Sequence, residues 1–148
     1  MKIRLMTIDD YESLYELWLR TPGLGLNTTD DSKEGIAKYL KRNPTTSFVA
    51  EYDGNIVGAI LTGHDGRRGM ISHTVVDVNY RRKGIAKALV DSAMNALKEE
   101  GITKVFLVAF KRNEVANQFW EAYGFTTRED LNYRNKCIVE LERIDTYC

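Results

Sequence analysis

The chain has 148 residues and 43% of them are apolar, so it is long enough for one globular domain with a substantial core. Its 21 basic and 21 acidic side chains cancel, and the pI is about 6.7. No global charge therefore favours a nucleic acid or an anionic membrane as partner, and any affinity for phosphate must be local.

The soft metal ligands are few and widely spaced. Cys137 and Cys148 lie near the C-terminus, and His64 and His73 are the other candidates, so we expect neither a metal site nor a disulfide framework. The N-terminal residues lack the apolar stretch of a secretion signal, and no segment approaches the roughly 20 apolar residues of a membrane span. We therefore expect a cytoplasmic protein with reduced thiols and without a membrane or nucleic-acid partner.

The first part of the chain predicts a strand, two helices and a hairpin. Asp9 with Glu12, and Asp31 with Glu34, have capping-box spacing before apolar residues at the helical period. The turn Asp53-Gly54-Asn55 lies between two strand-like runs and predicts a hairpin. In chain order the elements are a strand at 3–6, a helix at about 9–20, a helix from Asp31 to just before Pro44, and strands at 47–52 and 55–63.

The second part of the chain alternates strands and helices. Gly101 and Gly124 stand where glycines end helices, and Asn113 is an N-cap candidate. The run Lys104–Phe110 is almost unbroken in apolar residues, which is typical of a strand buried on both faces. The elements are strands at about 70–78, 104–110, 125–127 and 137–142, and helices from Gly84 to about residue 100 and from Asn113 to Tyr123.

This order, β-α-α-β-β-β-α-β-α-β-β, predicts the α/β (α+β) fold class. We expect a single domain over residues 1–148, in which a mixed central sheet of about six or seven strands is flanked by four helices.

The segment VDVNYRRKGIAKAL, residues 76–89, places cations and a glycine at the start of a helix. The first N–H groups of a helix lack internal partners and carry about half a positive charge, and Gly84 leaves room for close approach. With Arg81, Arg82 and Lys83 around it, this turn is suited to a diphosphate. The alternative is a helix start with solvated basic residues. Neither of the phosphate-loop patterns G-x-x-x-x-G-K-[ST] and G-x-G-x-x-G is present.

Two motifs of this chain resemble those of one enzyme family. Arg81-Arg82-Lys83-Gly84-Ile85-Ala86 resembles the R/Q-x-x-G-x-G/A signature of the GNAT superfamily of acetyl-CoA-dependent N-acetyltransferases. Asn113-x-x-Ala116-x-x-Phe119-Trp120-x-x-Tyr123-Gly124-Phe125 resembles the second cofactor motif of that family, and nearly the whole chain fits its order of elements.

The resemblance implies a set of contacts to acetyl-CoA. The backbone of Val76 and Val78 would pair with the pantetheine arm, and an amide near Val76 would polarise the thioester carbonyl. Tyr123 is implied as the general acid that protonates the departing thiolate. The helical spacing alone would explain Asn113 as a cap, and Phe119 and Tyr123 as core residues. The implied cofactor-binding residues are Val76, Val78, Arg81, Arg82, Lys83, Gly84, Ile85, Ala86, Lys87, Asn113, Ala116 and Phe119.

The general base is less clearly indicated. Some family members carry a glutamate on the fifth strand, but the matching stretch here, residues 106–109, has no carboxylate. His73 and Asp77 on the preceding strand are available, and we take His73 as the candidate catalytic base; the alternative is a histidine that only hydrogen-bonds beside the sheet. Neither cysteine has an activating base nearby in sequence, which favours direct transfer over an acyl-enzyme.

The predicted function is transfer of the acetyl group of acetyl-CoA to a primary amine in a ternary complex. The acceptor stays open between a small amine, an amino acid and a peptide N-terminus, and residues 23–31 correspond to the family's variable acceptor loop. The alternative is a non-catalytic acyl-CoA-binding or sensing module. A nucleic-acid binder fits poorly with zero net charge. A homodimer is open to the chain because family members often dimerise.

Overall fold

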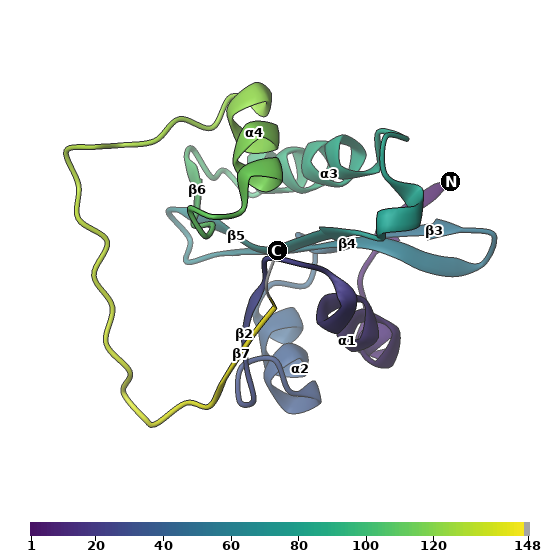
Figure 1. Cartoon of the computed structure of the whole chain (residues 1–148), viewed down its shortest axis with the longest axis horizontal. Coiled ribbons are helices and arrows are strands. Elements are labelled where there is room, and N and C mark those ends of the chain that lie inside the picture. Colours follow the sequence, from purple (N-terminus) through teal and green to yellow (C-terminus); the bar gives the residue numbers. More distant parts are fainter. Residues whose placement is uncertain (147–148) are drawn as a thin grey trace.

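The computed structural model, which describes residues 1–146, is a mixed sheet between two layers of helices (Figure 1). The sheet has the strand order β1-β3-β4-β5-β6. Its neighbours pair antiparallel except β5 and β6, which run parallel. The strands are β1 (Lys2–Leu5), β3 (Phe48–Tyr52), β4 (Asn55–His64), β5 (Gly69–Val76) and β6 (Val105–Leu107).

The helices cover both faces of this sheet. The first pair, α1 (Tyr11–Arg20) and α2 (Lys33–Arg42), lies on one face, and the second pair, α3 (Ile85–Glu99) and α4 (Glu114–Tyr123), lies on the other (Figure 1). The predicted α/β class, with four helices flanking a mixed sheet, is therefore confirmed for the described residues.

Each face has its own apolar core. On the α1 and α2 face, Leu14, Leu17 and Trp18 of α1 are completely buried against β3, β4 and β5. On the other face, Leu89 and Val90 of α3 are likewise buried against β4 and β5. Alternate side chains of one strand point to opposite faces, so the central strands contribute to both cores.

The caps of the first two helices differ from the prediction. The capping box is formed by Thr7 and Asp10, which precede α1 through a 3₁₀ turn (Ile8–Asp10), rather than by Asp9 and Glu12. At α2 the N-cap is Ser32, whose hydroxyl accepts a hydrogen bond from the backbone N–H of Gly35 at 3.0 Å. Asp31 is therefore not needed to cap α2.

The predicted strand over residues 104–110 is shorter and more exposed than expected. Only Val105–Leu107 pairs with β5, and Phe106 and Val108 are 48% and 51% exposed. Within the described residues β6 is one of the two edge strands of the sheet, so its outer edge is unpaired. The prediction of burial on both faces was wrong because apolar content does not distinguish an edge strand from a central one.

The C-terminal part also departs from the prediction. Residues 125–127 and 137–142 form no strand in the described structure; they belong to an extended segment that leads from α4 to β7 (Figure 1). Strand β7 (Arg143–Asp145) pairs antiparallel with β2 (Gly25–Asn27), whose residues belong to the expected acceptor loop. The expected six or seven strands are thus divided between the five-stranded sheet and this two-stranded one.

Strand β5 ends earlier than predicted. Its last residue is Val76, and Val78 lies in a 3₁₀ turn (Val78–Tyr80) that leads toward α3. The expectation that Val78 continues the strand is therefore wrong. Asp77 closes this turn by accepting a hydrogen bond from the backbone N–H of Asn79 at 2.9 Å.

The packing of α3 predicts a clear difference between two Leu→Ala variants. Leu89 is completely buried in α3, whereas Leu19 of α1 is 44% exposed. We expect Leu89→Ala to lower the free energy of unfolding by about 2–5 kcal/mol, because the substitution leaves a cavity. Leu19→Ala is the matched control, with an expected change of about 0.5 kcal/mol or less. Urea denaturation measures both, and equal losses would contradict the assignment of this core.

Candidate active site

The central feature of the candidate site is a gap between β5 and β6. Their parallel pairing ends at Ile71 and Leu107, and beyond these residues the strands no longer pair. A cavity of ≈ 480 Å³ opens there. Its walls come from the α1–β2 loop, both strands, the start of α4 and the segment after it: Thr21, Pro22, Gly23, Leu24, Gly25, Met70, Ile71, Ser72, His73, Thr74, Leu107, Val108, Ala109, Phe110, Asn113, Ala116, Trp120 and Tyr133.

A β-bulge in β5 lies where this gap begins. Between the pairs Ile60↔Thr74 and Thr62↔Ile71, β5 contains one residue more than β4, so Ser72 and His73 form an irregular step. Bulges of this kind change the direction of side chains and often lie beside active sites.

The backbone of β5 beyond the bulge has a free edge. The N–H of Asp77 donates to the carbonyl of Val57 on β4 at 2.7 Å. Peptide groups alternate along an extended strand, so the N–H of Val76 points to the opposite edge, toward the gap. This amide is available to an extended ligand.

The basic turn before α3 has the backbone geometry of an anion-binding loop. Arg82 and Gly84 have positive φ angles of 64° and 75°, and α3 begins at Ile85. A Cβ built on Gly84 would meet no atom within 4 Å, so the approach to the first amides of α3 is open. Arg81, Arg82 and Lys83 are exposed around it. Successive amides and a helix N-terminus together favour phosphate groups.

Asn113 caps α4 and also packs against the α1–β2 loop. Its Oδ1 accepts a hydrogen bond from the backbone N–H of Ala116 at 3.2 Å, which confirms the predicted N-cap. A Cβ built on Gly23 would lie 2.2 Å from Nδ2 of Asn113, so only glycine fits at that position. The side chain thus joins α4 to the loop at the wall of the cavity.

Tyr123 and Phe119 lie apart from the cavity wall. The Tyr123 hydroxyl donates to Oδ1 of Asp91 on α3 at 2.5 Å. Burial, together with this carboxylate, raises the pKa of Tyr123 to about 12. Phe119 packs into the core beneath α3 and α4, and its neighbour Trp120 lines the cavity. Tyr123 is therefore separate from the residues of the cavity wall, which include His73.

The two candidate bases have different surroundings. His73 lines the cavity, packs edge-on against Trp18 with ring centroids 4.9 Å apart, and its Nε2 lies 2.6 Å from Oδ1 of Asp31. Asp77 instead accepts hydrogen bonds from the backbone N–H of Asn79, in the turn after β5, and from the side chain of Arg20 on α1. These two bonds, chiefly the one from Asn79, hold the pKa of Asp77 below its usual range. Asp77 is thus held by the turn and by Arg20, whereas His73 lies at the cavity wall.

The sequence placed Asp31 at the cap of α2 and at the end of the acceptor loop but did not pair it with His73, and it did not identify Thr21 and Pro22 of the cavity wall. Asp31 was assigned to the cap of α2, yet the adjacent Ser32 is itself a good N-cap residue. Because Ser32 is a sufficient cap, the acidic Asp31 beside it needed another explanation, and this was the signal in the sequence. Thr21 and Pro22 gave none, because their role depends on the position of the loop.

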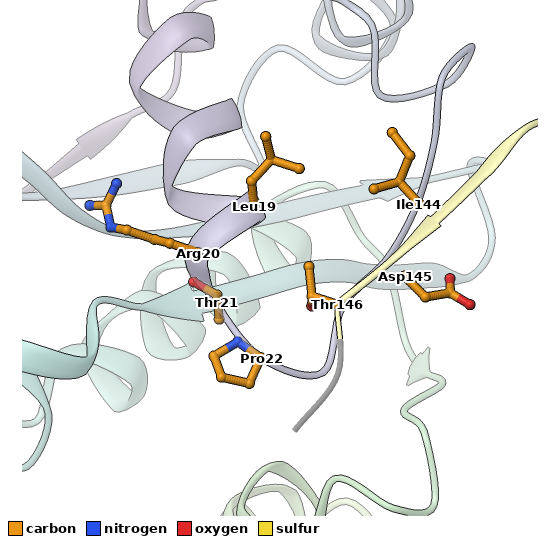
Figure 2. Close-up of a pocket in the computed structure, with 7 residues that line it drawn as sticks. All are labelled: Leu19, Arg20, Thr21, Pro22, Ile144, Asp145 and Thr146. Carbon is orange, nitrogen blue, oxygen red and sulfur yellow. The ribbon is translucent and has the colours of Figure 1, made fainter.

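A second hollow, of ≈ 360 Å³, lies between the end of α1 and β7 (Figure 2). Its charged side chains, Arg20 and Asp145, point away from one another in Figure 2 and offer no converging groups. The chemistry is therefore concentrated at the gap between β5 and β6.

The described residues contain neither a cluster of metal ligands nor a membrane-spanning helix. Across residues 1–146, no three His, Cys, Asp or Glu side chains gather as they would around a metal ion. None of the helices in the same range has the length and apolar character that a membrane crossing needs. Cys148 lies outside the described residues, and Cys137 is exposed.

Comparison with known proteins gives consistent matches over nearly the whole chain. The profile of the acetyltransferase (GNAT) family matches residues 11–125. An acetyltransferase of Pectobacterium atrosepticum is 30% identical over 142 residues, which cover 96% of this chain and 99% of that protein.

The solved structures that resemble this chain share its fold at low sequence identity. A ribosomal-protein-alanine N-acetyltransferase of Brucella melitensis superposes with a TM-score of 0.67 at 22% identity, covering 92% of this chain and 98% of that one. An aminoglycoside N-acetyltransferase in complex with a CoA bisubstrate analogue superposes with a TM-score of 0.71 at 20% identity, with the same coverage. The chain therefore belongs to the GNAT family of acetyltransferases, whose acetyl donor is acetyl-CoA.

Proposed function

We propose that this chain transfers the acetyl group of acetyl-CoA directly to a primary amine while both substrates are bound. The observation that carries the proposal is the cavity at the gap between β5 and β6. Its wall includes α4 residues from one layer of helices and the α1–β2 loop, which leaves α1 in the other layer. Donor and acceptor would therefore approach from different sides and meet at the bulge.

The donor would bind mainly through the backbone. The amides from Arg82 to Lys87 would hold the pyrophosphate, and the free N–H of Val76 would bond the pantetheine arm or polarise the thioester carbonyl. What supports this is the open approach at Gly84 and the unpaired edge of β5. Asn113 and Ala116 border the same cavity and would contact the pantetheine.

His73 would act as the general base. An amine acceptor enters as an ammonium ion with a pKa near 10, and it must lose a proton before its lone pair can attack the thioester. The position of His73 in the bulge, at the wall of the cavity, supports this role.

Tyr123 would act as the general acid. A tyrosine hydroxyl is protonated at neutral pH, so it has a proton to give to the thiolate. Burial and Asp91 raise the pKa of Tyr123 to about 12, which makes it a weaker acid while the contact with Asp91 lasts. To do so, the hydroxyl must exchange the Asp91 carboxylate for the sulfur.

The proposal leaves the acceptor at the level of a primary amine. The aminoglycoside and the ribosomal-protein alanine belong to the structures named above, and at 20–22% identity these resemble this chain in fold alone. The α1–β2 loop, which lines the cavity with Thr21, Pro22 and Gly23, is the segment that would contact the acceptor.

The binding of the donor can be tested with two pairs of arginines. We expect calorimetric titration to show binding of acetyl-CoA, and Arg81→Ala/Arg82→Ala to weaken it roughly ten- to a hundredfold, since a hydrogen bond to a charged group contributes about 1.5–3 kcal/mol. Arg67→Ala/Arg68→Ala is the control, because this pair precedes β5 and lies at its opposite end. Equal Kd values for the two double variants would overturn the assignment of the loop.

The role of Tyr123 can be separated from its bond to Asp91. We expect Tyr123→Phe to lower kcat about a hundredfold, the usual scale for a lost general acid, while the Kd of acetyl-CoA stays within about twofold. Asp91→Asn removes the carboxylate that holds the hydroxyl, and it should leave kcat nearly unchanged. Acetylation of a panel of primary amines, monitored by release of CoA, measures both variants. An unchanged kcat in Tyr123→Phe would remove this residue from the mechanism.

A homodimer, which the family resemblance leaves open, can be tested at an exposed apolar segment. Between α4 and β7, Leu131, Tyr133, Ile138 and Val139 are 60–100% exposed, which supports self-association through this segment. We expect sedimentation velocity to show a dimer that Ile138→Ser/Val139→Ser dissociates. A monomer in the unmodified protein would contradict the expectation.

A further inference from the structure

His73 and Asp31 form a short contact between two largely buried side chains. Nε2 of His73 lies 2.6 Å from Oδ1 of Asp31, and the two side chains are only 14% and 7% exposed. The other carboxylate oxygen, Oδ2, accepts a hydrogen bond from the backbone N–H of Asn27 at 2.9 Å. An ionised carboxylate can only accept hydrogen bonds, so we assign the hydrogen of this contact to Nε2 of His73.

Asp31 is itself fixed from several sides. Its backbone carbonyl accepts from the hydroxyl of Tyr11 on α1 at 2.6 Å, and its backbone N–H donates to the carbonyl of Asn27 at 3.3 Å. These bonds attach the residue both to α1 and to the end of β2. The carboxylate therefore cannot follow the ring if the ring turns, and it fixes the orientation of the imidazole.

The other ring nitrogen has no bond to the protein. Among residues 1–146, no side chain or backbone group bonds Nδ1 of His73, while the ring packs edge-on against Trp18. In a neutral imidazole whose Nε2 carries the hydrogen, Nδ1 holds the free lone pair. The ring thus has one nitrogen bonded to Asp31 and the other available to a substrate.

We propose that Asp31 is a positioning residue for His73, which holds the Nε2–H form of the ring so that Nδ1 takes the proton of the acceptor ammonium; this inference rests on the proposed function. The N–H bond of the ammonium breaks and an Nδ1–H bond forms, and the imidazolium is then stabilised by the adjacent carboxylate. The freed amine attacks the thioester. The nitrogen loses its second proton and the thiolate takes up a proton as the C–S bond breaks, and His73 returns its proton to water.

The hydrogen position can be measured without an acceptor. Long-range ¹H–¹⁵N NMR distinguishes the two neutral forms of histidine, and only His64 and His73 are present, so a His73→Gln variant assigns the signals. We expect the Nε2–H form in the unmodified protein and its loss in Asp31→Asn. An Nδ1–H form in the unmodified protein, or an unchanged spectrum in Asp31→Asn, overturns the inference.

Kinetics separate positioning from a structural role. Asp31→Asn should lower kcat about a hundredfold, with little change in the KM for acetyl-CoA, as for loss of a general base. In the His73→Gln background the same substitution should cost nothing further, because the two residues act as one unit. Asp53→Asn is the control, since this exposed residue lies in the turn between β3 and β4 and outside the cavity wall, and it should keep kcat within about twofold.

The possible failures are distinct. If His73→Gln keeps full kcat with the best amine of the panel, the proposed base is wrong and the inference falls with it. If His73→Gln loses activity but Asp31→Asn does not, the proposed function stands and only the role of Asp31 is overturned. Additive losses in the double variant would likewise assign Asp31 to structure alone.

Discussion

The separation of β5 from β6 is the feature on which the site depends. A parallel pair that stayed hydrogen-bonded over all of β5 would leave neither a cavity nor a free backbone edge. The bulge at Ser72 and His73 lies at the point of separation, where it changes the direction of the His73 side chain. The gap, the free edge at Val76 and the position of His73 therefore lie together on one short stretch of β5.

The surrounding layers hold this irregular edge in place. Trp18, completely buried in α1, packs against the ring of His73, and Asn113 at the start of α4 fits against Gly23 in the α1–β2 loop. These contacts join elements that are distant in sequence but adjacent around the cavity. Side-chain packing from both faces thus stabilises the sheet at the gap. In a continuous sheet, backbone hydrogen bonds between the two strands would do so.

The elements that sequence predicted well are those with local signals. The start of α3 after Gly84, the Asn113 cap of α4 and the β3–β4 hairpin each follow from neighbouring residues. Three features depend on partners that lie 36 to 120 positions apart in the sequence: the pairing of β2 with β7, the edge position of β6, and the contact of Asp31 with His73. Periodicity carries no information about such partners, so these features required the structure.

The geometry also explains how a chain of zero net charge can serve two oppositely charged substrates. The diphosphate region of the donor would meet main-chain amides and three exposed cations at the start of α3, beyond the end of β5. The ammonium acceptor would meet His73 and the buried carboxylate of Asp31 at the bulge, near the start of the gap. The cations before α3 and the carboxylate of Asp31 lie at different positions along β5. This separation matters because a buried carboxylate beside the phosphates would repel them and oppose their binding. Direct transfer then needs only the reacting ends to meet in the cavity, and the exposed Cys137 lies outside its wall.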